Sequence, residues 1–178
     1  MRFTVPYLGN RTYVQGTTVF DALEWALDRN VVIKFSRPMY RNILEAVEGD
    51  TTAPCQFTWD NVAGKQHLGV REVGQTDYRI PYDEETIAAS ATYEGRTASF
   101  SPKKLMDIVA VNKRLLHQMA PPRAGEQYLF SRLDLIDAPY FVTPITLEVS
   151  GKAGDTYMSK VTMGFRLGTL YFTKHKKL

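Results

Sequence analysis

The sequence predicts an α+β fold in which helices pack on an antiparallel sheet. Two segments carry apolar residues at helical spacing, and each is followed by strand-like alternation. The composition is that of a globular protein, with 44% hydrophobic and 23% charged residues in 178. A chain of this length is expected to form one compact domain spanning 1–178.

The first expected helix covers Thr18 to Asp28. Phe20, Leu23 and Leu27 recur at helical spacing. Thr18 together with the acidic Asp21 resembles a capping box, and Asn30 is the expected end of the helix. The segments 31–36, 56–59 and 67–72 are then expected as short strands.

The second expected helix begins at Ser101-Pro102, where a hydroxyl cap precedes a proline in the first turn. Pro121 and Pro122 end it. One apolar stripe on this helix carries Leu105, Ile108, Val109, Leu116 and Met119. Before the helix, the segment 86–93 is expected to be a strand.

The sequence after the second helix predicts an antiparallel meander of four strands, 127–135, 141–150, 155–165 and 169–174. Gly151 to Asp155 would form a hairpin, and Gly168 would bend or end a strand. A helix followed by strands thus occurs in each of two halves, 1–73 and 86–178, which the polar segment 74–85 joins. This element order is the reason for suspecting a duplication.

Net charge and cysteine content bear on the expected partners and cellular compartment of the protein. A net charge of +3 does not force an acidic partner, so nucleic acid is not expected, and the basic residues 174–177 are interpreted as a solvated end. The single Cys55 cannot form an internal disulfide. With no signal peptide or membrane span in the sequence, we expect a cytoplasmic protein without a membrane partner.

Sequence motifs exclude several classes of chemistry. There is no P-loop, no Gly-x-Gly-x-x-Gly after a strand and no Gly-x-Ser-x-Gly turn. His67, His117 and His175 are far apart, and the lone cysteine has no second ligand nearby. Neither a metal nor a cofactor is therefore expected.

Two segments near the N-terminus carry a resemblance. One is Gly9-Asn10-Arg11 followed by 14–23, and the other is Ile33-Lys34-Phe35-Ser36-Arg37-Pro38. They resemble the 3-hydroxyacyl-carrier dehydratases of the hot-dog superfamily. The second half is similar in layout to the hot-dog acyl thioesterases.

The resemblance implies a hot-dog-like fold with helices on a curved antiparallel sheet, which the chain would form as two degenerate hot-dog units or as one unit with an added half. It implies an acyl-thioester ligand, either acyl-CoA or an acyl carrier protein, and leaves a homo-oligomer open. The family's catalytic His falls on Pro6 and its acidic helix residue on Asp21. Asn10 and Gly16, in the turn and before the helix, are the substrate-binding candidates that it marks.

Further candidates come from the second helix. Asn112 lies on the apolar stripe, where it is either a core amide satisfied by a backbone carbonyl or a polar group directed at substrate. His117 is a second catalytic candidate, with a surface histidine as the alternative. Ser101, Lys103 and Lys104 would bind substrate at the helix start, where free N–H groups could stabilise a thioester oxyanion, although Ser101 is first of all a cap.

Two functions are therefore carried forward. One is acyl-thioester binding of a thioesterase-like kind, so that an enzymatic activity would be that of a thioesterase or a dehydratase-related lyase. The alternative is a non-catalytic binding or assembly module on the same fold, which would explain proline in place of the catalytic His. Aromatic residues of the later strands are interpreted as core or tunnel wall; they are Tyr128, Phe130, Tyr157, Phe165, Tyr171 and Phe172.

Overall fold

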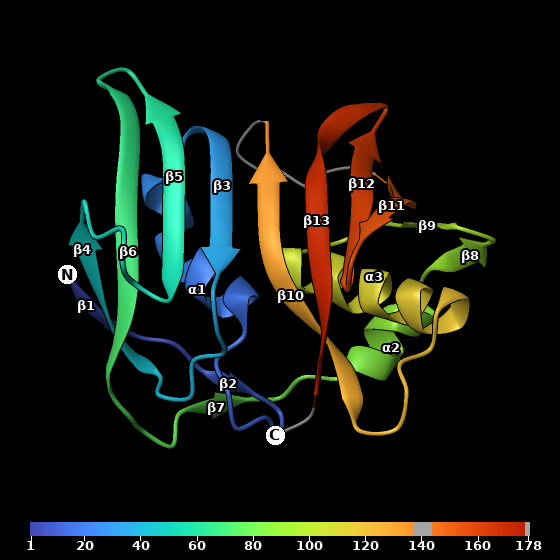
Figure 1. Cartoon of the computed structure of the whole chain (residues 1–178), viewed down its shortest axis with the longest axis horizontal. Helices are drawn as coiled ribbons and strands as arrows, with labels where there is room; N and C mark the ends of the chain where they lie inside the picture. Colours follow the sequence, from blue (N-terminus) through green and yellow to red (C-terminus); the bar gives the residue numbers. More distant parts are fainter. Residues whose placement is uncertain (137–143, 177–178) are drawn as a thin grey trace. The chain divides into compact units, whose positions relative to one another are not determined.

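The chain divides into two units, each with a mainly antiparallel sheet and few helices (Figure 1). This computed structural model describes residues 1–136 and 144–176. Unit 1 is Met1–Asp83 and unit 2 is Glu84–Leu178. The α+β class with an antiparallel sheet is confirmed, whereas the single domain 1–178 and the halves 1–73 and 86–178 stay predictions.

Unit 1 contains five strands that pair antiparallel in the order β1-β4-β6-β5-β3. In chain order they are β1 (Arg2–Thr4), β3 (Arg29–Phe35), β4 (Ile43–Glu48), β5 (Cys55–Asn61) and β6 (Gly64–Gly74). A separate parallel pair joins β2 (Tyr7–Leu8) to β7 (Arg79–Ile80). The sequence predicted β3, β5 and β6 but missed β4, whose Leu44-Glu45-Ala46 run consists of good helix formers.

The helix of unit 1 begins earlier and ends sooner than predicted. It is α1 (Gly16–Leu23), continued by a 3₁₀ turn, η1 (Glu24–Ala26). The expected capping box is wrong, because Gln15 is the N-cap and the Thr18 hydroxyl donates to the Gln15 carbonyl at 2.8 Å. Asn30 does not end the helix; it lies in β3 with a φ of 53°.

The described residues of unit 2 form six strands in the order β10-β13-β12-β11-β9-β8, all antiparallel. They are β8 (Thr92–Glu94), β9 (Thr97–Phe100), β10 (Glu126–Leu135), β11 (Ile145–Ala153), β12 (Thr156–Met163) and β13 (Phe165–Lys176). The last three form the expected meander. The strand β10 does not neighbour β11, since it pairs with β13 instead. Residues 141–143 of the expected second strand lie outside the described residues.

Within 84–136 and 144–176, unit 2 has two helices: α2 (Glu84–Ala89) and α3 (Leu105–Met119). The strand expected over 86–93 is wrong, because the first half of that segment belongs to α2 and only its last two residues lie in β8. Ser101 is not the cap of α3, which begins four residues later with Lys104 as N-cap. Neither helix, nor α1, has the length and apolar character that crossing a membrane requires in the described part of the chain.

The C-terminal basic segment is part of the sheet as far as the structure describes it. The strand β13 continues through Lys176, and Lys174 pairs with Tyr128 of β10. Lys174 is half-buried, whereas His175 and Lys176 are exposed. The interpretation of this segment as a solvated end is therefore wrong for Lys174.

Candidate functional site

Asn112 is the most unusual polar residue of α3. Its side chain is fully buried, with 0% of its surface exposed, among apolar neighbours on the same helix such as Ile108 and Leu116. Neither amide atom has a hydrogen-bond partner among the described residues. The backbone carbonyl expected to satisfy a core asparagine is not found in the described part of the chain. A buried amide without partners costs about 1–3 kcal/mol, which makes Asn112 a candidate for a role beyond packing.

Two buried hydroxyl groups also lack a hydrogen-bond partner among the described residues. Ser159 of β12, in unit 2, is 0% exposed, and Thr17 of α1, in unit 1, is 1% exposed. Their oxygens likewise lack partners within residues 1–136 and 144–176. Thr17 follows Gly16, the half-buried first residue of α1. The sequence analysis singled out Gly16 and Asn112 but gave no signal for Thr17 or Ser159, because an isolated hydroxyl has no distinctive spacing.

The remaining candidates of unit 1 lie around α1. Asp21 is half-buried on that helix, and Asn10 is exposed in the turn after β2. Pro6, where the resemblance places the catalytic His, is half-buried between β1 and β2. A proline side chain cannot exchange a proton, so this position offers no acid or base.

The start of α3 does not present the free N–H groups that the sequence analysis expected. The Asp107 carboxylate accepts hydrogen bonds from the backbone N–H of Lys103 at 2.7 Å and of Lys104 at 3.2 Å. Ser101 and both lysine side chains are exposed. The N–H groups of Lys103 and Lys104 are thus already bonded to the Asp107 carboxylate, so they are not the free oxyanion donors that the sequence analysis expected.

His117 lies in a charged groove of unit 2, on a different face of α3 from Asn112. The groove has a volume of about 380 Å³ and lies between α2 and α3. Lys113 pairs with Glu84 and Arg114 with Glu85, both at 3.0 Å. Burial, helped by the positive charge of Lys113, lowers the pKa of His117. Asn112 does not line this groove.

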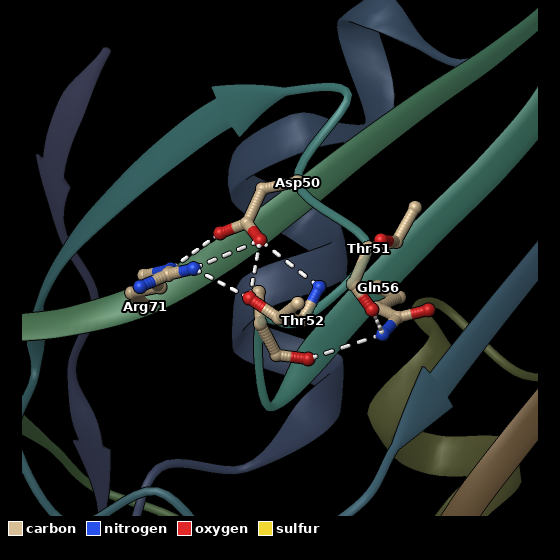
Figure 2. A network of polar contacts seen from close by, with 6 residues as sticks. Asp50, Thr51, Thr52, Gln56 and Arg71 are labelled. Carbon is tan, nitrogen blue, oxygen red and sulfur yellow. Dashed lines mark hydrogen bonds and ion pairs between the residues drawn. The ribbon is translucent and has the colours of Figure 1, made fainter.

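A second hollow, of about 350 Å³, lies in unit 1 beside β6. Arg71 projects from β6 and is held by Asp50 and Thr52, as Figure 2 shows; its Nη2 donates to the Asp50 carboxylate at 2.9 Å and to the Thr52 hydroxyl at 2.7 Å. Arg37 pairs with Glu72 at 2.7 Å. Because each arginine faces its own carboxylate, we interpret this network as a structural element of the turn before β5.

This network makes stability depend on pH. The hydrogen bond from Arg71 holds the pKa of Asp50 well below its usual value of 3.8. A carboxyl with a depressed folded-state pKa stabilises the fold above its unfolded pKa, and this contribution is lost as the pH falls. We expect Asp50→Asn to lower the thermal midpoint at pH 7, and the difference from the unchanged protein to shrink below about pH 3.8. Equal differences at pH 7 and pH 2 in thermal unfolding would contradict this.

Other nucleophiles and ligands were sought over the described residues. Burial raises the pKa of the Cys55 thiol, which lies in the core of unit 1. No group of three or more His, Cys, Asp or Glu side chains that could hold a metal occurs in the part of the chain that the structure describes. The site chemistry therefore rests on Asn112, on the candidates around α1 and on His117.

Comparison with solved structures identifies the fold. The tesB protein of Mycobacterium avium subspecies paratuberculosis matches with a TM-score of 0.51 over 99% of this chain and 93% of its own, at 11% identity. This is a hot-dog fold. A pyran synthase domain from module nine of the sorangicin pathway has a TM-score of 0.49 at 12% identity, covering 99% of this chain and 94% of its own.

The dehydratase domain of RzxB from Pseudomonas fluorescens has a TM-score of 0.44 at 11% identity, covering 97% of this chain and 93% of its own. No protein-family model and no curated protein sequence matches the chain. At such low identity the hot-dog match establishes the fold, and the activity has to be argued from the residues themselves.

Proposed function

We propose that this hot-dog protein binds an acyl thioester, with the acyl chain inside unit 2 and the thioester next to Asn112. The observation that carries the proposal is the fully buried Asn112 amide, whose two ends have no partner among the described residues. Buried polar groups in a folded protein are normally hydrogen-bonded, and each exception calls for an explanation, of which a catalytic or binding role is one. Acyl-CoA and acyl carrier protein both present the required thioester.

The Asn112 amide offers complementary chemistry for that group. Its Nδ2 can donate to the thioester carbonyl oxygen, and its Oδ1 can accept from a water molecule. In a thioesterase-like reaction that water would attack the carbonyl carbon, the C–S bond would break, and a carboxylate and a thiol would leave. Asn112 would position water and stabilise charge on the oxygen, because an amide does not exchange protons.

Within unit 2, His117 is proposed as an acid–base group and Ser101, Lys103 and Lys104 as substrate contacts. Within unit 1, Asp21 is proposed separately as an acid–base group, with Asn10 and Gly16 as substrate contacts. For Ser101, Lys103 and Lys104 the proposal concerns the exposed side chains. The lowered pKa of His117 favours its neutral form at pH 7, in which it can accept a proton.

A non-catalytic binding or assembly module is the second candidate. It is favoured by Pro6 at the position of the family's catalytic His and by the distribution of polar groups on α3. Asn112 cannot exchange a proton, and the exposed His117 lies on another face of the helix. Such a module would bind the thioester without cleaving it.

We also propose that the two units are degenerate hot-dog units with helices on curved sheets, and that the protein is cytoplasmic and forms a homo-oligomer. In unit 2 the strands lie in the sheet in the order β9-β11-β12-β13-β10, and along the chain α3 lies between β9 and β10. Unit 1 has β1-β4-β6-β5-β3, with α1 between β1 and β3. When the strands are matched in chain order, β5 and β6 of unit 1 correspond to β12 and β13 of unit 2, and these two strands exchange places in the sheet. A divergent duplication would have to explain this exchange.

The test is a panel of acyl-CoA substrates with short and long chains. Binding is measured by calorimetry, and thiol release is followed with a thiol-reactive dye. We expect binding of at least one chain length; release of the thiol then indicates a thioesterase, and binding without release indicates the module. No binding of any acyl-CoA or acylated carrier protein would overturn both forms of the proposal.

A further inference from the structure

Four side chains meet on neighbouring strands of unit 2, apart from the proposed thioester position. Tyr157 of β12 pairs with Lys152 of β11, and Tyr128 of β10 pairs with Lys174 of β13. The Lys152 Nζ lies 5.1 Å from the centre of the Tyr157 ring. The Lys174 Nζ lies 5.5 Å from the Tyr128 ring centre and 5.8 Å from that of Tyr157. Both ammonium groups thus converge on one pair of phenols.

The aromatic pair provides a fixed base for the two lysines. The rings of Tyr128 and Tyr157 are 5.5 Å apart in an edge-to-face arrangement at 89°. Both tyrosines are buried, and the Tyr128 hydroxyl donates to the Ala120 carbonyl at the end of α3 at 2.6 Å. Contacts between ammonium groups and rings hold the lysine side chains in place. The arrangement is therefore largely preorganised.

No carboxylate of the described residues neutralises the positive charge of this cluster. Neither Lys152 nor Lys174 forms an ion pair among the described residues, whereas Lys113, Arg37 and Arg71 each face an acid. Lys174 is half-buried, where an unpaired charge is costlier than on the surface. A group that brings negative charge would relieve this cost.

The positive charges of Lys152 and Lys174 also affect the ionisation of the Tyr157 hydroxyl. Burial alone would raise the pKa of its phenol. The contact with the Tyr128 hydroxyl, a hydrogen bond from Lys152 and the charges of Lys174 and Lys152 reverse that effect and lower the pKa. The phenol oxygen therefore lies where negative charge is stabilised.

We propose that Lys152, Lys174 and the Tyr157 hydroxyl form a binding site for a phosphate group. Two ammonium groups match the charge of about −2 on a phosphate monoester near pH 7. Lysines bind phosphate as point charges, and the phenol adds a directional hydrogen bond. The site uses residues outside the proposed thioester site, and it can be occupied by free phosphate or by the phosphates of coenzyme A.

The test begins with titration of inorganic phosphate into the full chain, followed by heteronuclear NMR. We expect saturable binding that weakens with added salt, and a loss of about tenfold in affinity for each of Lys152→Met and Lys174→Met. Methionine keeps an apolar stem over the rings. Lys160→Met is the matched control, because Lys160 is exposed on the same strand as Tyr157; its affinity should be unchanged.

A second readout uses the phenol itself. Removing either ammonium group should raise the pKa of Tyr157 in an ultraviolet titration, and the assigned transition should be absent in Tyr157→Phe. Since Lys152 is exposed, Lys152→Met is expected to fold even if Lys174→Met does not. No phosphate binding, or equal affinity in folded Lys152→Met, would overturn the proposal.

Two further ligands separate the source of the phosphate and the two proposals. If coenzyme A binds more tightly than pantetheine and Lys152→Met removes the difference, the ligand is a phosphate of coenzyme A. If coenzyme A and pantetheine bind equally and inorganic phosphate binds, the ligand is the free anion. An acyl pantetheine, which has no phosphate, tests the thioester site alone. Its failure to bind counts against the proposed function and leaves the phosphate site standing.

Discussion

Replacing Asn112 by leucine is expected to raise the free energy of unfolding by about 1–3 kcal/mol, because it exchanges a buried amide without partners for an apolar group of similar size. The amide is 0% exposed, and neither of its polar atoms is bonded among the described residues. The same change should weaken acyl-thioester binding or slow hydrolysis roughly ten- to a thousand-fold. Chemical denaturation and the acyl-CoA panel measure the two effects.

Asn42 is the matched control, since it is also 0% exposed but fully hydrogen-bonded. Its Nδ2 donates to the Val5 carbonyl and to the Thr76 hydroxyl, each at 3.0 Å, and its Oδ1 accepts from the Thr76 N–H at 2.7 Å. Asn42→Leu should therefore lower the free energy of unfolding by about 3 kcal/mol or more. If both variants destabilise equally, Asn112 is an ordinary satisfied core residue and the thioester proposal loses its main support.

The sequence alone does not predict that replacing Asn112 and replacing Asn42 should change the free energy of unfolding in opposite directions. Asn112 was marked because it interrupts an apolar helical stripe, which is a local pattern. Whether an amide finds a partner depends on residues far away in the chain, as Thr76 is for Asn42. Spacing along a helix carries no information about such contacts.

The same distinction separates the correct from the incorrect fold predictions. The strands β10 and β12 and the helix α3 have strong local periodicity, and the sequence located each within a few residues. The helix α2 was predicted as a strand, although it is short and packs beside α3 with Lys113 paired to Glu84. A six-residue helix of this kind is stabilised by tertiary contacts and leaves little periodic signal.

The sequence did not indicate the proposed phosphate site, for a related reason. Tyr128 and Tyr157 were interpreted as core or tunnel wall, and Lys174 as part of a solvated end. Their approach depends on the pairing of β10 with β13 and of β11 with β12. The predicted meander placed β10 beside β11, which would have separated Lys174 from Tyr128. Strand order is fixed by pairing across the sheet and has no counterpart in local alternation.

Gly168 is a position where strand pairing imposes a strict limit on side-chain size. It was expected to bend or end a strand. It does not end one, since it lies within β13 opposite Leu135 of β10 and Val161 of β12, and the register of β12 against β13 shifts next to it, between Val161 and Thr162. A Cβ atom added there would approach the Asp134 carbonyl oxygen far inside van der Waals contact and would lie 3.1 Å from Leu135 Cδ2. The oxygen belongs to the backbone of a paired strand and cannot move without breaking that pairing.

Gly168→Ala is therefore expected to lower the free energy of unfolding by about 3 kcal/mol, at the upper end of the usual cost of overpacking. The thermal midpoint should fall by roughly 6–12 °C. Gly151→Ala in β11 is the matched control, because its added Cβ would meet Met158 Cε at 2.8 Å, the mobile end of a flexible side chain. Met158 can turn aside, so this variant should lose about 1 kcal/mol or less. Thermal and denaturant unfolding measure both changes, and a Gly168→Ala protein as stable as Gly151→Ala would show that β10 and β13 are less closely paired than described.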